Sequence, residues 1–220
     1  MERKNNNLNT KKMKRFIIIA ILSAGILFAG KANAQTGIHL GYSPEAWASE
    51  NSSLTLSSIF VGANHNLSLT GDLKLNIGGQ LRYGTESGSS SLWGIASGKH
   101  TTTIIGLDVP VLFNYGLSLG KDLTLAIFAG PKFTFNLSGK THYEGSVLGL
   151  GGSSDQEWFN DKSGSLNLKP FNAAVMGGLS LDFRQFRLFG GYSYGLTDVD
   201  NSNNTATKVG GPFFGLGYSL

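Results

Sequence analysis

Histidine is the residue type in this sequence with the widest chemical repertoire, and it occurs at four positions. They are His39, His65, His100 and His142. No two of them have the spacing of a metal-ligand pair, and the chain contains no cysteine, so we expect no metal site. A catalytic histidine would need a nucleophile and an orienting group beside it.

Serine side chains lie near two of these histidines without forming a recognisable catalytic pattern. His65 precedes Ser68 by three residues, which places the two side chains on opposite faces of an extended strand. His100 follows the Ser-rich segment 87–91, and no third member is identifiable. We therefore predict that the protein is not an enzyme and needs no cofactor.

Segment 198–204, with the sequence DVDNSNN, alternates oxygen-bearing side chains in the manner of a calcium-binding loop. Such a loop has Gly at its sixth position and closes with Glu, whereas this chain has Asn203 and Val209 at those places. We interpret the segment as a polar loop tip.

Charged side chains also occur inside otherwise apolar segments. They are Lys74, Arg82, Asp108, Lys132, Asp182 and Arg187. An unpaired charge in an apolar environment is costly, so whatever space these side chains face must pair or hydrate them.

The segments that carry these charges alternate with a period of two. In 73–83, Leu73, Leu75, Ile77, Leu81 and Tyr83 share one parity, and the polar residues take the other. Successive side chains of a strand point to opposite faces, so this pattern predicts a strand with one apolar and one polar face. Similar alternation marks 38–42, 59–67, 107–115, 123–137, 171–183, 186–196 and 212–220.

These eight predicted strands are joined by connections that alternate in length. The long connections are 43–53, 85–99, 138–166 and 197–207, and the short ones are 68–72, 116–122 and 183–185. This alternation is typical of an up-and-down barrel with one tight rim and one elaborated rim. Leu54 and Leu56 have the parity opposite to Ile59 and Val61, which predicts a β-bulge near Ser57.

The first 34 residues have the layout of a secretory signal peptide. A basic head at 13–15 is followed by an apolar run from Phe16 to Gly30 and by the small-x-small site Ala32-Asn33-Ala34. We expect cleavage before Gln35, and Met13 is an alternative start. The mature domain is then 35–220.

Removal of this segment changes the charge balance of the protein. Seven of the 18 basic residues but only one of the 14 acidic residues precede the cleavage site, which leaves 11 basic and 13 acidic side chains. The basic character of the whole chain therefore gives no reason to expect a nucleic-acid partner.

A membrane barrel and a soluble barrel or sandwich both show this alternation, but the membrane barrel is favoured. The apolar faces are long enough to cross hydrocarbon as tilted strands, with Val111 and Ile127 near mid-depth. Aromatic residues near the strand ends fit interfacial girdles. An eight-stranded barrel has room only for its own side chains, so we expect the six charges to pair across a packed lumen.

The segment 105–115, IGLDVPVLFNY, resembles a strand motif of the PorT-type outer-membrane β-barrel family of Bacteroidota, (L/I)-(E/D)-(I/V)-P-(L/V)-L-x-x-Y. The Gly130-Pro131 step and the segment 192–198 resemble two further parts of that family. The resemblance implies an all-β, eight-stranded antiparallel barrel in the bacterial outer membrane, and it carries no catalytic residues. Tyr218 and Leu220 resemble the C-terminal signal that the barrel-assembly machinery reads.

Three functions remain open. The first is a non-enzymatic barrel with a binding, structural or secretion-supporting role, in contact with outer-membrane lipid and an extracellular or envelope protein partner. The second is a lipid-modifying enzyme (lipid A acyl transfer or deacylation), and the third is a narrow channel. Eight strands place both mature termini in the periplasm, so 138–166 should be extracellular. We expect any binding surface there, with the exposed-looking pair Trp158 and Phe159 as anchors.

Overall fold

The structure is a computed structural model that describes residues 34–49, 53–92, 96–147, 150–159, 166–201 and 206–220. The predicted signal peptide up to Asn33, including Met13, lies outside the described residues. Residues Gln35–Leu220 form one structural unit. No helix in the described part of the chain is long and apolar enough to cross a membrane.

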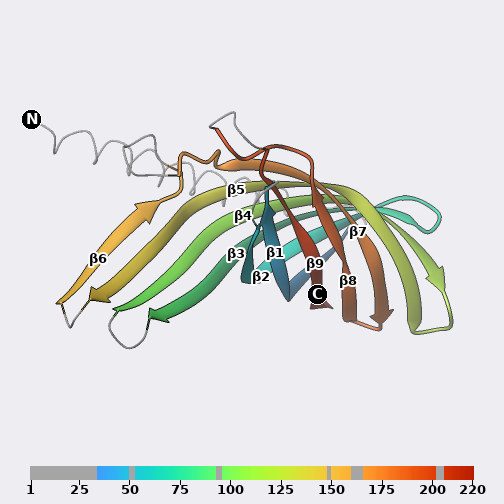
Figure 1. Ribbon diagram of the computed structural model, residues 1–220. Helices are drawn as coiled ribbons and strands as arrows, with labels where there is room; N and C mark the ends of the chain where they lie inside the picture. Colours follow the sequence, from blue (N-terminus) through green and yellow to red (C-terminus); the bar gives the residue numbers. More distant parts are fainter. Residues whose placement is uncertain (1–33, 50–52, 93–95, 148–149, 160–165, 202–205) are drawn as a thin grey trace, which may run out of the picture. The chain divides into compact units, whose positions relative to one another are not determined.

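Nine antiparallel strands make up the described fold (Figure 1). They are β1 (Ala34–Ala48), β2 (Ser53–Thr70), β3 (Leu73–Leu92), β4 (Ala96–Ser118), β5 (Leu123–Val147), β6 (Leu150–Glu157), β7 (Phe171–Phe183), β8 (Phe186–Gly195) and β9 (Lys208–Ser219). Eight of them form a closed ring in the order β1-β2-β3-β4-β5-β7-β8-β9, because β9 pairs with β1 from Gly37↔Ser219 to Ala48↔Lys208. The predicted eight-stranded barrel is therefore confirmed.

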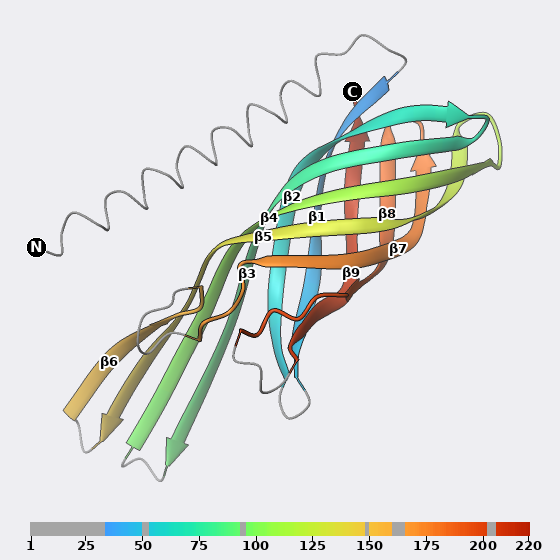
Figure 2. The ribbon, with the colours of Figure 1, turned by 90° about the horizontal axis from the view of Figure 1, so that it is seen from above.

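The ninth strand corrects the expected loop structure. Among the described residues, β6 pairs only with the end of β5, from Lys140↔Glu157 to Val147↔Leu150, within the segment 138–166 that the sequence predicts as a loop. The predicted loop 85–99 is also mostly strand, because β3 continues to Leu92 and β4 begins at Ala96. Together, residues 85–92, 96–105, 138–147 and 150–157 form a four-stranded extension, which we call the projecting sheet. Figure 2 shows these strands continuing beyond the ends of the others.

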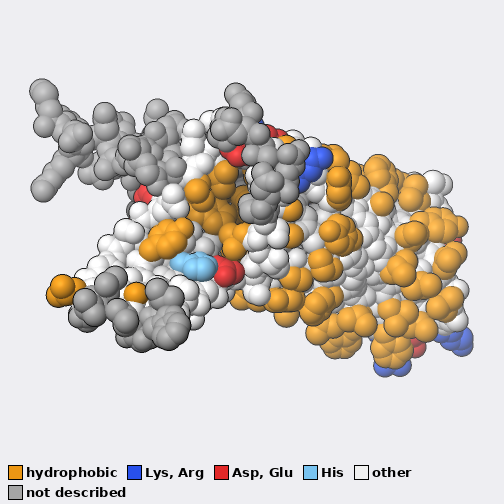
Figure 3. Space-filling model, viewed as in Figure 1, with side chains coloured by type: hydrophobic (Ala, Val, Ile, Leu, Met, Phe, Trp, Pro, Cys, Tyr) orange, Lys and Arg blue, Asp and Glu red, His pale blue; other side chains and the backbone are white. Residues whose placement is uncertain are grey.

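The barrel wall separates two faces as the alternation predicts. Asp108, Pro110 and Leu112 are buried in the lumen, whereas their neighbours Leu107, Val109 and Val111 point outward. Apolar side chains on this outer face remain exposed, with Ile127 at 57%. In Figure 3, apolar side chains spread over the barrel wall, and the projecting sheet is mainly small and polar.

One inserted residue changes which side chains face inward. Gly106 pairs with Asn136 and Ile105 pairs with Ser138, so Leu137 is an extra residue on β5. Before this bulge, Thr134 and Asn136 point into the lumen; after it, Thr141 is the buried residue. The bulge thus shifts the inward-facing side chains of β5 from even-numbered to odd-numbered positions where the projecting sheet begins.

The bulge predicted near Ser57 is wrong. Ser57 and Ser58 pair with Thr85 and Gly84 in uninterrupted register. Leu56 is fully buried and Leu54 packs against the same apolar cluster, so the change of apolar parity has another cause. At that level the inside of the barrel is apolar, and the strand itself is regular.

Val111 tests the assignment of the outer face to lipid. We expect Val111→Arg to lower the free energy of unfolding in lipid vesicles by about 2–4 kcal/mol, because the charge would lie in hydrocarbon. Leu117→Arg, close to the turn that follows β4, should cost only about 0–1 kcal/mol. Urea titrations of the two variants measure this difference, and equal costs would contradict a lipid-facing Val111.

Candidate functional site

Four charged side chains meet in the middle of the lumen. Arg82 on β3 has its Nη1 2.7 Å from Glu45 Oε2 on β1, and its Nε 3.5 Å from Asp108 Oδ2 on β4. Lys132 Nζ on β5 is 3.6 Å from Glu45 Oε1. All four are buried, and Asp108 has no exposed surface. The two cations and two carboxylates balance each other, and we call this group the charge layer.

Neutral polar side chains complete the coordination of the charge layer. Arg82 Nη2 donates to Asn136 Oδ1 at 2.7 Å, while Thr134 Oγ1 and Gln80 Nε2 donate to the two oxygens of Asp108 at 2.8 and 3.1 Å. The close Arg82–Glu45 contact is an ion pair without good hydrogen-bond geometry, since Arg82 Nη1 and Glu45 Oε2 have no hydrogen-bond partner. The layer therefore depends on charge balance as well as on aligned hydrogen bonds.

The six charged residues expected in the lumen do not form one network. Arg82, Asp108 and Lys132 belong to the charge layer. Asp182 and Arg187 form a separate pair near the turn between β7 and β8, with Arg187 Nε and Nη2 donating to the two carboxylate oxygens at 2.6 and 2.9 Å. Lys74 has lumen-facing parity but is exposed at the barrel end.

Glu45 is the member of the charge layer that sequence reasoning missed. It lies in 43–53, which we had predicted as a connection, although β1 continues through it to Ala48. Ser43, Glu45 and Trp47 are all buried and share the inward parity of His39. Continuing the alternation past Tyr42 would have identified Glu45.

Two apolar clusters fill the lumen on either side of the charge layer. The outer cluster, which lies toward the projecting sheet, consists of Trp47, Leu56, Ile104, Trp158, Val199 and Val209. The inner cluster consists of Phe60, Leu112, Phe128, Met176 and Phe213, with Phe189 packed against it. The described residues thus fill the lumen in successive apolar and charged levels.

Trp158 is part of the outer cluster, so the expectation that it is exposed is wrong. It is 2% exposed, its ring lies 5.1 Å from that of Trp47, and its Nε1 donates to Thr141 Oγ1 at 2.9 Å. Phe159 is partly buried against the same cluster. After β6 the backbone returns to the barrel, where Trp158 N donates to Gly139 O, and this places the indole inside the barrel mouth.

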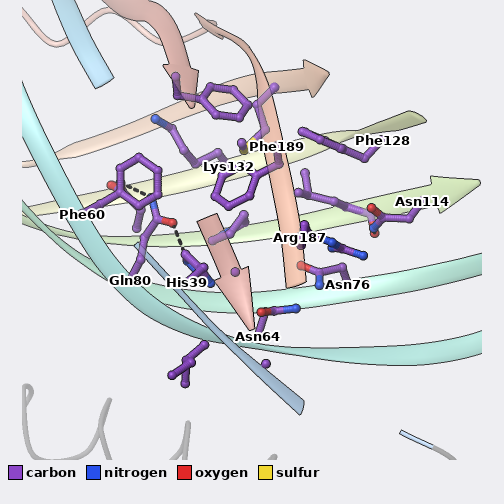
Figure 4. A pocket seen from close by; sticks show the side chains of 18 of the residues that line it. His39, Phe60, Asn64, Asn76, Gln80, Asn114, Phe128, Lys132, Arg187 and Phe189 are labelled. Carbon is purple, nitrogen blue, oxygen red and sulfur yellow. Dashed lines mark hydrogen bonds between the residues drawn. The ribbon is translucent and has the colours of Figure 1, made fainter. Parts of the chain in front are cut away.

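A cavity of about 80 Å³ remains in the lumen, between the charge layer and the barrel end where the short turns lie (Figure 4). Its lining includes the amide side chains of Asn64, Asn76 and Asn114 together with phenylalanines of the inner cluster. His39 and Gln80 are hydrogen-bonded at 3.0 Å beside it. The cavity is thus amphipathic, and the inner cluster narrows it.

Two histidines of the projecting sheet lie beside carboxylates on opposite faces. On one face, His100 Nε2 is 3.1 Å from Glu86 Oε2. On the other, His142 Nδ1 is 2.6 Å from Asp155 Oδ1 and its Nε2 is 3.4 Å from Glu144 Oε1. The hydrogen bond that His142 Nδ1 donates to the carboxylate of Asp155 raises the pKa of His142. The hydrogen bond from Lys140 lowers the pKa of Asp155.

Of the calcium-loop-like segment 198–204, the structure describes residues 198–201, and there the carboxylate of Asp198 binds backbone N–H groups. Asp198 Oδ1 accepts hydrogen bonds from the N–H groups of Asp200 and Thr207, at 2.9 and 2.8 Å, and these bonds lower the pKa of Asp198. Among the residues that the structure describes, no group of three or more His, Asp or Glu side chains is arranged to hold a metal ion.

The sequence matches the family described as outer membrane protein beta-barrel domain over residues 28–201. The chain belongs to this family, and it is a bacterial outer-membrane β-barrel protein.

Among solved structures, the chain is similar to Ail, the attachment invasion locus protein of Yersinia pestis, with 15% identity and a TM-score of 0.45 over 86% of this chain and 100% of Ail. It is also similar to Neisserial surface protein A, with 13% identity and a TM-score of 0.41 over 86% and 100% of the two chains. The translocator domain of NalP from Neisseria meningitidis gives 10% identity and a TM-score of 0.36 over 96% and 97%. No curated protein matches the sequence.

Glu45 tests the charge layer. Glu45→Gln leaves Arg82 and Lys132 buried with Asp108 as their one carboxylate, so we expect a loss of about 3–5 kcal/mol in the free energy of unfolding. Arg184→Gln is the control, because it breaks the exposed pair of Arg184 and Asp122 and should cost at most about 1 kcal/mol. Urea unfolding in vesicles compares them. If the Glu45→Gln protein were as stable as the wild type, the stability of the charge layer would not depend on equal numbers of cations and carboxylates.

His142 gives a pH-dependent prediction. Its pKa should lie above the usual value of 6.5 and should fall toward that value in Asp155→Asn, as followed by the imidazole carbon shifts in NMR. Because the folded-state pKa is raised, the stabilisation from this contact is complete below the unfolded pKa. It is lost as pH rises through the folded pKa. Unchanged titration in Asp155→Asn would assign the shift to another group.

Proposed function

We propose that this protein is a non-enzymatic outer-membrane barrel that presents its projecting sheet outside the cell as a binding surface. The observation that carries this proposal is the contrast between a filled lumen and a four-stranded sheet built beyond the barrel. Strands cost conformational entropy to order, and a sheet of this length is not needed to close the barrel.

The filled lumen supports binding over transport. A solute would have to pass the outer cluster around Trp158, then the charge layer, then the inner cluster around Phe128. Eight-stranded barrels leave little space beyond their own side chains, and here two of the three levels are apolar. A narrow channel is therefore the weaker interpretation.

The surroundings of the outer histidines support binding over lipid modification. A histidine that activates a serine needs one ring nitrogen for the nucleophile and the other for an orienting group. Both ring nitrogens of His142 face carboxylates, and His100 Nε2 faces Glu86. These contacts fit charge pairing on a polar sheet.

The proposed orientation places both ends of the mature domain and the short turns in the periplasm. Leu220 N donates to Thr36 O, so the ends of β1 and β9 lie together at the barrel end that carries the turns at Gly71 and Arg184. Tyr218 and Leu220 at this end suit recognition by the barrel-assembly machinery, and the outer apolar face suits outer-membrane lipid. We also propose that the chain is one of the PorT-type barrels of Bacteroidota, a proposal that the motif in 105–115 supports. Its proposed partner is an extracellular or envelope protein.

The absence of cysteine allows a direct test of this orientation. In intact cells, a membrane-impermeant maleimide should label Ser154→Cys on β6 and should not label the matched variant Gln185→Cys in the β7–β8 turn. Both positions are exposed, so access alone decides the result. After permeabilisation both should react. Labelling of Gln185→Cys but not Ser154→Cys in intact cells would show that the topology is the reverse of the one proposed. The projecting sheet would then not be an extracellular surface.

A further inference from the structure

The face of the projecting sheet that continues the lumen side of the barrel carries two aromatic rings side by side. The strand register places Gly88, His100, Tyr143 and Ser154 in one row across β3, β4, β5 and β6. The rings of His100 and Tyr143 have centroids 6.2 Å apart and planes inclined by 38°. Tyr143 is 43% exposed, so the two rings form an open surface, which we call the ring platform.

Small residues keep this platform accessible. A Cβ on Gly88 would overlap the imidazole of His100, so the ring lies against the backbone of β3. The next row away from the barrel consists of Ser90, Gly98, Gly145 and Gly152. No side chain in that row is larger than serine, and a flat ligand can reach both rings from that side.

Planar polar groups border the platform on its barrel side. Glu86 and Gln156 lie at opposite ends of the neighbouring row, which continues through Thr102 and Thr141. Glu86 uses one oxygen for His100, and Gln156 accepts a hydrogen bond from the Tyr143 hydroxyl at 3.4 Å. The other carboxylate oxygen and the amide N–H groups face no further partner among the described residues, so they can exchange hydrogen bonds with a ligand.

We propose that the ring platform binds the ring of a neutral sugar, an inference that rests on the proposed binding function of the projecting sheet. A pyranose has an apolar C–H face that packs on aromatic rings, and hydroxyls at its edge that pair with carboxylate and amide groups. The platform offers both on one face of the sheet. Glu86 disfavours anionic sugars through like-charge repulsion, which selects a neutral ligand.

Neutral sugars reach an outer membrane from two sources, as soluble glycans and as the sugars of lipopolysaccharide. Saturation-transfer NMR on the full-length mature protein in lipid nanodiscs, free of sugar detergents, separates them. One arm uses methyl β-D-glucopyranoside, methyl β-D-galactopyranoside and N-acetylglucosamine, and the other uses delipidated lipopolysaccharide oligosaccharide. We expect saturation of the axial ring protons in at least one arm, and the arm that responds identifies the source.

Variants locate the site within the projecting sheet. Tyr143→Ser should abolish the transfer and Tyr143→Phe should retain it, because the ring makes the stacking contact. His142→Ser is the matched control, since it is the adjacent residue of β5 on the opposite face and should bind like the wild type. Heat-modifiable gel migration checks that each variant is folded.

Absence of transfer in both arms, or transfer that survives in Tyr143→Ser, would overturn the proposal. Maleimide labelling of Ser154→Cys reports the exposure of the sheet without any sugar. Failure of sugar binding is therefore distinguishable from failure of the proposed orientation.

Discussion

The requirement that every backbone N–H and C=O group within hydrocarbon has a partner inside the protein determines most of this structure. Lipid cannot satisfy an open strand edge, so a sheet that crosses the membrane must close on itself. Here closure is the pairing of β1 with β9, which joins the first and last strands of the domain along almost their full length. Beyond the membrane water satisfies the backbone, and only there does the sheet open into free-standing strands.

Closure with eight strands in turn determines which side chains can occupy the lumen. The polar face of each strand must turn toward a space too narrow for bulk water, so its side chains have to satisfy one another. Glu45, Arg82, Asp108 and Lys132 do so by balancing charge across four strands. Apolar side chains fill the levels above and below, and glycines such as Gly41 and Gly178 leave room for Phe60 and Phe128. The lumen is therefore packed like a protein core, except that its central level consists of charged side chains.

The alternation in the sequence was sufficient to predict the ring, because each wall strand has one face in lipid and one in the lumen. It failed where that contrast ends. Along most of the projecting sheet both faces meet water, so serine, threonine and glycine occur on both sides and no period is visible in the sequence. The predictions for Leu54, Leu56 and Trp158 were wrong because these residues face an apolar level of the lumen. From the sequence alone, an inward apolar residue at such a level cannot be distinguished from a lipid-facing or exposed one. The pairing of His100 with Tyr143 depends on the register between β4 and β5, which includes the extra residue at Leu137 and which no local pattern encodes.

The extra residue at Leu137 has an evolutionary consequence. The residues on either side of Leu137 already pair with consecutive residues of β4, so deleting its codon would leave a regular strand with the same side chains on each face. Thr141 and Tyr143 would keep their places beside Thr102 and His100. A lineage of such barrels can thus lose or regain a residue at this point without altering the chemistry that the projecting sheet shows to its surroundings.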